Sequence, residues 1–409
     1  MDAGAAEADL DQAAVDRTGL ITGERILRGA RNWWFVGPGG VARLRAGHLT
    51  ADGLLKPEVE RRLREQGLLS VPRVRTYSLT VLTSTDCNLG CGYCFQNTSQ
   101  DLTGGNRPPR IAHARLTSPT ITSILDFTAR QMAVAELEKL RILLFGGEPL
   151  LNPRGCVELL ARAADYGLAS AWMISNATLL TPSLARQLEE HKLDCIQVTF
   201  DGDRDDHDQI RIRRSRSQGG TYDAIVANLV RASGTCSIKW LLRVNVSHHN
   251  HGGIDALIDR LAGALDTSRC TIYFARVGDV GVGYGNDLLH TGELVANFTR
   301  WQRRALDAGF TVTRPKANRP CATCGSGDGR HGAVVSADGE LSSCWETAGK
   351  PDWNVGSAGD GYRPETVTSQ RWIGCGDLYQ YEEDAPAIAS FRDAVDANLI
   401  DYLEETGRL

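Results

Sequence analysis

The feature that most constrains this chain is a loop with three closely spaced cysteines, Cys87, Cys91 and Cys94. The loop directly follows an apolar, strand-like run at residues 78–83. Closely spaced cysteine thiolates are the usual ligands of iron–sulfur clusters. Because no fourth cysteine lies near them in the sequence, we expect the loop to hold three corners of a four-iron cluster and to leave one iron open for a ligand.

Two other interpretations of the loop are a zinc knuckle and three unrelated buried thiols. Zinc sites generally complete a set of four Cys or His ligands. The next histidine along the chain, His113, follows only after a stretch rich in proline and arginine. This favours the iron–sulfur cluster.

Composition excludes several classes of protein. The chain has 409 residues with 42% hydrophobic and 23% charged residues, which is typical of a globular protein of more than one domain. A net charge of −5 gives no argument for nucleic acid or an anionic membrane as partner. No run approaches the roughly 18 apolar residues of a membrane span, and the N-terminus lacks the pattern of a secretion signal. We therefore expect a cytoplasmic protein that binds neither nucleic acid nor membrane.

The eleven cysteines are better read as metal ligands than as disulfides in such a chain. Seven of them fall in two groups, at 87–94 and 321–375. The remaining four lie singly in apolar patterns, and we expect them in the core because free cysteine behaves as a small hydrophobe. They are Cys156, Cys195, Cys236 and Cys270.

The first 75 residues predict a small N-terminal module. Residues 1–17 are rich in Ala, Asp and Glu, and we expect them to be disordered. Within 18–75, two strands at 32–36 and 41–44 flank a glycine-rich turn, and a helix follows over 58–66. Such a hairpin and helix could dock an extended peptide at a sheet edge or cap the bottom of a larger domain.

Residues 76–312 alternate short apolar strands with helical patterns, which predicts an α/β fold with a parallel sheet. The strands are expected at 79–84, 140–145, 170–175, 194–200, 238–246 and 270–277, and the helices at about 118–136, 153–167, 181–191, 221–233 and 252–265. Six such units fall short of the eight of a closed TIM barrel, and loops at the carboxyl ends of the strands form the active site in such folds.

The sequence Gly-Gly-Glu-Pro directly follows the second of these strands, at residues 146–149. Glycine lets the backbone approach a ligand closely, and the carboxylate of Glu148 can accept a hydrogen bond from an ammonium group. Together with the three-cysteine loop, in which an aromatic residue precedes the last thiol, this pattern resembles the radical S-adenosylmethionine (radical SAM) superfamily. The resemblance implies a partial (β/α)6 TIM-type barrel that carries a [4Fe-4S] cluster on the three-cysteine loop and binds SAM.

The resemblance also implies which residues bind SAM. The stretch Asp201-Gly202 with His207, Asp208 and Arg211 is similar to a superfamily pattern in which serine stands where this chain has Thr199. Arg211 could clamp the SAM carboxylate in a bidentate way, while Asp201 could bond the ribose or simply order its loop. The full expected set is Tyr93, Gly146, Gly147, Glu148, Ser175, Asn176, Asp201, Arg211, Arg243 and Asn245.

Residues 313–409 carry the second group of cysteines, Cys321, Cys324, Cys344 and Cys375. A hairpin is expected around Ala337-Asp338-Gly339, and its spacing to Cys344 resembles a SPASM domain. Four thiols match the shortened Twitch version, which implies one auxiliary [4Fe-4S] cluster; a zinc ribbon is the alternative. A final amphipathic helix at 385–403 is expected to pack on this domain.

The resemblance implies an enzyme that forms a 5′-deoxyadenosyl radical and abstracts hydrogen from its substrate. The N-terminal module and the SPASM-like segment favour a maturase of a ribosomally made precursor peptide that forms a carbon–carbon or thioether crosslink, with flavodoxin or ferredoxin as electron donor. One alternative is a radical SAM dehydrogenase that oxidises a small alcohol or a protein Ser or Cys. Another is a non-catalytic iron–sulfur or zinc protein. No catalytic acid or base stands out, although Asp279, Tyr284 and Glu346 are positions of interest.

Overall fold

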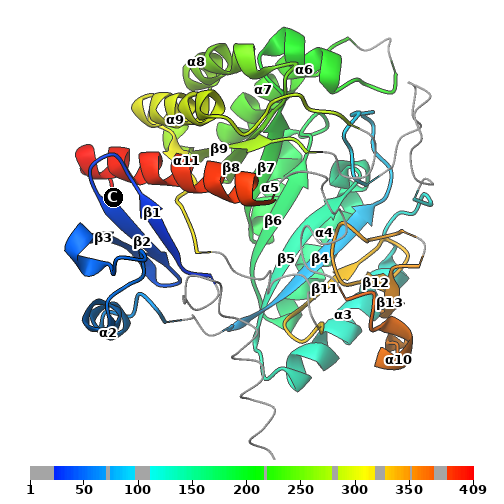
Figure 1. Cartoon of the computed structure of the whole chain (residues 1–409). Coiled ribbons are helices and arrows are strands. Elements are labelled where there is room, and N and C mark those ends of the chain that lie inside the picture. Colours follow the sequence, from blue (N-terminus) through cyan, green and yellow to red (C-terminus); the bar gives the residue numbers. More distant parts are fainter. Residues whose placement is uncertain are drawn as a thin grey trace, which may run out of the picture.

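The computed structural model describes residues 23–70, 74–96, 111–215, 219–278, 284–317, 328–350, 352–372 and 385–409. Its centre is one large twisted sheet whose strands follow the order β10-β9-β8-β7-β6-β5-β4-β11-β12-β13-β14 (Figure 1). The eight strands from β10 to β11 in this order are parallel, and those from β11 to β14 are antiparallel. The strands are β4 (Thr76–Ser84), β5 (Lys139–Gly146), β6 (Leu168–Ser175), β7 (Leu193–Phe200), β8 (Lys239–Val246), β9 (Cys270–Arg276), β10 (Thr311–Val312), β11 (Gly332–Val335), β12 (Glu340–Ser342), β13 (Asn354–Ser357) and β14 (Gly361–Tyr362).

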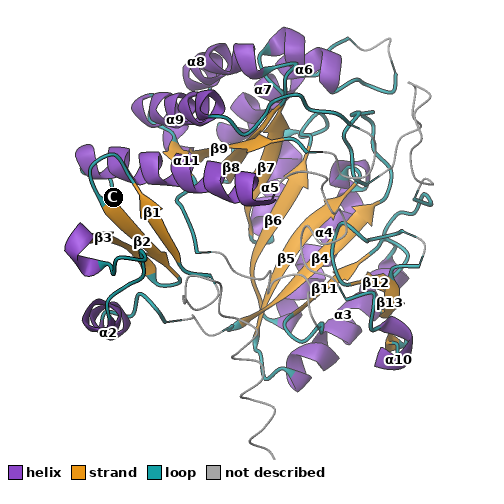
Figure 2. Ribbon diagram, in the orientation of Figure 1, coloured by secondary structure: helices purple, strands orange, loops and turns teal. Residues whose placement is uncertain are grey.

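Helices alternate with the parallel strands (Figure 2). They are α3 (Ser118–Val134), α4 (Pro153–Ala163), α5 (Pro182–Glu190), α6 (Arg204–Ile210), α7 (Tyr222–Ser233), α8 (Ile254–Ala264) and α9 (Gly292–Asp307), followed by α10 (Glu365–Thr368) and α11 (Ala385–Glu405). Short 3-10 turns lie at η1 (Ala46–His48), η2 (Pro149–Leu151), η3 (Ala164–Tyr166), η5 (His251–Gly253) and η6 (Thr267–Arg269). The six predicted strands correspond to β4–β9, so the predicted α/β fold with an open parallel sheet is confirmed. Within the described residues the sheet does not close into a barrel.

Several helices begin with the same local signal, a side-chain cap followed by proline. Thr117, Asn152 and Thr181 each accept a hydrogen bond from a backbone N–H of the first turn of α3, α4 and α5, respectively. Each helix also has proline in its first two positions, where the missing N–H costs nothing. The helix starts in this half of the sheet are therefore determined locally.

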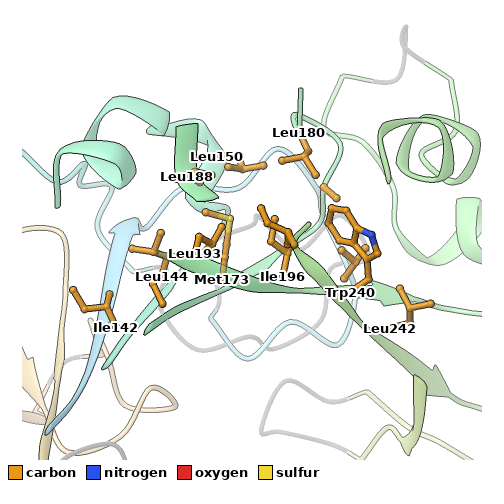
Figure 3. Close-up of a cluster of buried hydrophobic side chains, with 14 of the residues drawn as sticks. Ile142, Leu144, Leu150, Met173, Leu180, Leu188, Leu193, Ile196, Trp240 and Leu242 are labelled. Carbon is orange, nitrogen blue, oxygen red and sulfur yellow. The ribbon is translucent and has the colours of Figure 1, made fainter. Parts of the chain in front are cut away.

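The main core lies between the sheet and the helices. Figure 3 shows Ile142, Leu144, Met173 and Ile196 extending from β5, β6 and β7 toward Leu150 and Leu188, which lie on η2 and α5. Because successive side chains of a strand point to opposite faces, their neighbours Leu143, Trp172 and Gln197 face the other side of the sheet. Leu143, Trp172 and Gln197 line a cavity on this opposite face, which we call the inner face of the sheet.

The N-terminal module is a three-stranded antiparallel sheet of β1 (Arg25–Arg28), β2 (Trp33–Gly37) and β3 (Gly40–Leu44), with α2 (Pro57–Glu65). Phe35 and Leu44 pack against Val59 and Leu63 of α2 on one face. The predicted hairpin and helix are both present. β1 was not predicted, because four residues with arginine at both ends carry no clear strand pattern.

The final helix packs against a part of the chain that we did not expect. Within the described residues, α11 contacts mainly α9 and β1 (Figure 1). Ala397 and Ile400 contact Trp34 on the second face of the N-terminal sheet. Asp401 accepts hydrogen bonds from Trp34 Nε1 at 2.7 Å and from the Ala30 backbone N–H at 2.6 Å. The helix therefore joins the two ends of the chain.

The C-terminal hairpin is present as β11 and β12, and its position is unexpected. β11 pairs in parallel with β4, with Val334 opposite Thr80. The segment therefore continues the central sheet beside the strand that leads into the three-cysteine loop. No helix in the described part of the chain is long and apolar enough to cross a membrane.

The packing of Trp34 predicts that it stabilises the whole N-terminal module. Its side chain is fully buried and it hydrogen-bonds Asp401. Replacing Trp34 by alanine leaves a large cavity and removes one of the two hydrogen bonds to the Asp401 carboxylate, so we expect a loss of about 3–5 kcal/mol in the free energy of unfolding. Chemical denaturation of the full chain measures this. The control Val134→Ala, at a side chain that is 74% exposed, should change stability by less than about 0.5 kcal/mol; equal effects would contradict this account of the packing.

Candidate active site

The three-cysteine loop begins where β4 and β5 end side by side. The backbone N–H of Gly147 donates to the Ser84 carbonyl at 2.9 Å, and that of Glu148 donates to the Asp86 carbonyl at 2.8 Å. A Cβ on Gly146 would lie 2.2 Å from the Ser84 oxygen, and one on Gly147 would lie 2.3 Å from the Asp86 oxygen. The two glycines thus permit close contact with the backbone directly before Cys87, a contact that the sequence did not reveal.

The other side of the loop is fixed by the segment after α6. The Gly90 N–H donates to the Ile212 carbonyl at 2.8 Å, and the Arg214 N–H donates to the Asn88 carbonyl at 3.0 Å. The Arg214 side chain also pairs with Asp86 at 2.7 Å. The loop is therefore held between two backbone segments.

The three thiols lie largely away from solvent. Cys91 is buried, and Cys87 and Cys94 are partly buried. Burial raises the pKa of the Cys91 thiol to about 11, and burial together with the Glu148 carboxylate raises the pKa of Cys87. Among the described residues, no three Cys, His, Asp or Glu side chains are close enough to hold a single metal ion. Three cysteine thiols on one short loop are a ligand set of iron–sulfur clusters, whereas a structural zinc site takes four Cys or His ligands.

Glu148 lies in a fully buried network with Ser175 and Asn176. Its Oε1 accepts from Ser175 Oγ at 2.7 Å and from the Leu150 N–H at 2.9 Å. Its Oε2 accepts from the Asn176 N–H at 2.7 Å. Burial raises the pKa of this carboxyl group, and these hydrogen bonds oppose the rise. The structure thus brings together three of the residues that the resemblance assigned to SAM.

Asn176 also connects this network to the cysteine loop. Its Nδ2 donates to Asn88 Oδ1 at 2.8 Å and lies 3.9 Å from Cys87 Sγ. The next residue, Ala177, has a φ of 56°, a left-handed conformation that costs energy for a residue other than glycine. Such strain is common at functional sites, and here it turns the chain directly after the two residues that bond Glu148.

Tyr93, Asp201 and Arg211 form a second buried group. Tyr93 donates its hydroxyl hydrogen to Asp201 Oδ2 at 2.7 Å, and Arg211 Nη1 donates to both Tyr93 Oη at 2.8 Å and Asp201 Oδ2 at 3.2 Å. Burial alone would lower the pKa of Arg211, but Tyr93, Cys91 and Asp201 raise it well above its usual value. Arg211 therefore stays charged. Its Nε is buried with no hydrogen-bond partner among the described residues, so it can still donate to an anionic ligand.

His207 orders the backbone of Asp201, which belongs to this group. Its Nδ1 accepts from the Asp201 N–H at 3.3 Å, and its Nε2 lies 3.0 Å from Thr221 Oγ1. Burial and the nearby Arg211 lower the pKa of His207 well below its usual value. The neutral ring thus orders the loop that carries Asp201.

Arg243 and Asn245 lie together on β8. Arg243 Nε donates to Asn245 Oδ1 at 2.7 Å, and its guanidinium lies over the Tyr273 ring at 5.8 Å. Tyr273 in turn donates to Gln197 Oε1 at 3.2 Å. The pair therefore faces the inner side of the sheet, next to β7.

Tyr284, a position of interest in the sequence, lies edge-on to Tyr93, with ring centroids 5.6 Å apart. Other residues near the site were not predicted. Trp172, Gln197 and Trp345 line an inner cavity of about 250 Å³. No motif contains Trp172 or Gln197. Only the alternation of inward- and outward-facing side chains along β6 and β7 could have indicated their position.

The second cysteine group is only partly described. Cys344 is buried, and the next residue, Trp345, packs on Phe145 with ring centroids 5.5 Å apart. Burial lowers the pKa of Lys350 to about 8, while Glu346, Cys94 and Cys344 oppose this effect, so Lys350 is within electrostatic range of both cysteine groups. Cys321, Cys324 and Cys375 lie outside the described residues, as does Asp279. The auxiliary cluster stays a prediction.

Comparison with known proteins identifies the central part of the chain. Residues 81–261 match the family model of the radical SAM superfamily. This part of the chain is a radical SAM domain. Such a domain implies an enzyme with SAM and a [4Fe-4S] cluster as cofactors. The residues fit both, since three thiols share one loop and the charged Arg211 keeps an unused buried donor.

The similar proteins match only part of this chain or match it at low identity. The chain is 28% identical over 145 residues to an AdoMet-dependent heme synthase and 27% identical over 175 residues to an Fe-coproporphyrin III synthase, both of Methanosarcina barkeri. These matches cover 35% and 43% of this chain, but only 36% and 38% of the relatives. Among solved structures, anSMEcpe with bound AdoMet and the Kp18Cys peptide has a TM-score of 0.57 at 16% identity, over 81% of this chain and 99% of that one. At that identity the likeness shows a shared fold alone.

The glycine contact predicts that cluster assembly depends on Gly147. In Gly147→Ala the added Cβ would meet the Asp86 carbonyl at 2.3 Å, and the backbone before Cys87 must move. We expect at least a several-fold loss of iron bound per chain after anaerobic reconstitution. The control Gly263→Ala, where a Cβ meets nothing within 4 Å, should bind iron like the unaltered chain. Full iron content in Gly147→Ala would contradict the role given to this contact.

Proposed function

We propose that this radical SAM enzyme modifies a ribosomally made precursor peptide and forms a carbon–carbon or thioether crosslink. The observation that carries the proposal is the N-terminal three-stranded sheet that α11 fixes beside the radical SAM domain. In the described chain, β1 and β3 each have a single strand neighbour. An open edge of this kind can add an extended peptide as a further strand, so it could hold the leader of a precursor.

The inner cavity suits an amino-acid side chain. Its volume of about 250 Å³ lies below the roughly 300–1,000 Å³ typical of pockets that enclose a drug-sized ligand. Trp172 is 43% exposed and gives the cavity an aromatic surface. Gln197 gives it a polar amide group. A single side chain of a peptide fills such a space better than a tetrapyrrole.

The residues of the chain have distinct roles in this proposal. When bound, the cluster and SAM supply the 5′-deoxyadenosyl radical that removes hydrogen from the substrate. Arg211 binds the SAM carboxylate, and Asp201 and Tyr93 hold Arg211 in place. Trp172 and Trp345 position the substrate side chain and exclude water.

The C-terminal segment would support electron transfer. Four thiols are the complement of one four-iron cluster, so we propose that Cys321, Cys324, Cys344 and Cys375 bind an auxiliary [4Fe-4S] cluster. The position of β11 beside β4 supports this, because it brings the segment next to the strand that leads into the three-cysteine loop. Flavodoxin or ferredoxin would supply the electron for the first cluster.

The role of Arg211 predicts a specific binding defect. Arg211→Met removes the charge and the free Nε donor but keeps the apolar stem. Because hydrogen bonds to charged groups contribute about 1.5–3 kcal/mol, we expect SAM affinity to fall by roughly 10- to 100-fold. Equilibrium binding to the reconstituted protein measures this. Arg204→Met is the control, since Arg204 pairs with Asp223 at the surface; equal losses in both variants would contradict the assignment.

The proposed reaction is tested by the product. The full chain is expressed with short peptides encoded beside its gene, and each peptide is fragmented by mass spectrometry. We expect a product lighter by two hydrogens whose fragments stay linked between two residues. An unlinked carbonyl at Ser or Cys would instead identify the dehydrogenase alternative, and formation of heme or of Fe-coproporphyrin III would indicate the reactions named for the curated relatives. Either result would overturn the crosslinking proposal.

A further inference from the structure

A second and larger cavity lies where the N-terminal sheet, α11 and the edge of the central sheet meet. Its volume is about 700 Å³. Its floor is apolar and is formed by side chains of β9, β10, α9 and α11. Figure 1 shows β9, α9 and α11 close together. The side chains of the floor are Ile272, Phe274, Val312, Phe298, Phe391 and Val395.

The rim of this cavity is cationic. Arg314, Lys316 and Arg392 line it and are exposed. Arg314 donates to the backbone carbonyl of Arg408, a contact that brings no counter-charge. Three positive side chains thus surround an apolar floor.

Asp396, the acidic side chain in the lining of this cavity, is already hydrogen-bonded. Asp396 accepts from Arg25 Nη1 at 2.6 Å, and Arg25 also bonds Asp393 and the Lys316 carbonyl. The Arg25 side chain is only 4% exposed. This ion cluster links β1 to α11. Asp393 and Asp396 also act on Arg392, but the four basic side chains Arg25, Arg314, Lys316 and Arg392 still outnumber these two carboxylates.

Tyr273 connects this cavity to the inner one. It lines the larger cavity, and its hydroxyl donates to Gln197, which lines the inner cavity. A chain lying in the larger cavity would therefore pass from the N-terminal sheet toward the inner face of the radical SAM domain.

We infer that this cavity binds an acidic and apolar segment of the peptide substrate, between the part held by the N-terminal sheet and the residue that reacts. Apolar side chains would pack on Phe274 and Phe391, and carboxylates would pair with Arg314, Lys316 and Arg392. The inference rests on the proposed function, since it takes a peptide as the substrate. Charge complementarity and the apolar floor favour a peptide over a nucleic acid, whose phosphates would find the cations but whose backbone would not fill the floor.

The test uses two labelled synthetic peptides of twelve residues, one alternating Glu with Leu and Phe and the other with Lys in place of Glu. We expect fluorescence anisotropy of the full chain to show at least tenfold tighter binding of the acidic peptide, weakened by added salt because exposed charges are screened. The double variant Arg314→Glu with Lys316→Glu should lose at least tenfold in affinity for it. Arg154→Glu with Arg186→Glu, on the exposed surfaces of α4 and α5, should bind it unchanged.

Equal affinity for the two peptides, or equal losses in the two double variants, would overturn the inference. Tighter binding of an oligouridine than of the acidic peptide would also overturn it. Binding is measured without SAM, so failure of the crosslinking reaction would not alter this readout. Conversely, a crosslinked product from an enzyme that ignores peptide charge would leave the proposed function standing and remove this inference.

Discussion

The site depends on the backbone contact between the end of β5 and the residues that precede the cysteine loop. Gly147 and Glu148 donate to Ser84 and Asp86, and this contact requires glycine because a Cβ at 146 or 147 would meet a carbonyl oxygen. From it follow the position of Cys87 and the burial of the Glu148 carboxylate. Through Asn176, it also connects the loop to the end of β6. One short stretch of backbone thus positions both the thiols and the polar residues around them.

A second constraint joins the ends of the chain. α11 lies between the N-terminal sheet and α9, with Asp401 bonded to Trp34 and Arg25 bonded to Asp393 and Asp396. Removal of the N-terminal module would expose the apolar face of α11, so a truncation would confuse loss of peptide binding with loss of stability. Point substitutions are the cleaner way to study this module.

The sequence predicted the central sheet well because its signals are local. Alternating short apolar runs and longer helical patterns located β4–β9 and the helices between them. It could not predict that β11 joins β4, because a hairpin pattern does not say which strand it will meet. The amphipathic pattern of α11 likewise predicts a buried face but not its partner, and here β1 lies more than 350 residues away in the sequence.

The residues of the candidate site also divide into those that sequence motifs predicted and those that they could not predict. Glu148, Asp201 and Arg211 were found through motifs that resemble the superfamily, and the structure places them in two buried networks. Trp172 and Gln197 belong to no motif, and they line one cavity with Trp345 only because neighbouring strands bring them there. The steric role of Gly146 and Gly147 was missed for a similar reason: a sequence shows that glycine is present, but not which backbone lies against it.

The central claim is that the loop of Cys87, Cys91 and Cys94 holds a four-iron cluster whose open iron binds SAM directly. Electron–nuclear double resonance of the reduced, anaerobically reconstituted chain with SAM labelled at its amino nitrogen tests this claim most directly. The account predicts a hyperfine coupling between the cluster and that nitrogen. A chain that holds only zinc, or a reduced cluster whose spectrum shows no coupling to the labelled nitrogen, would contradict it.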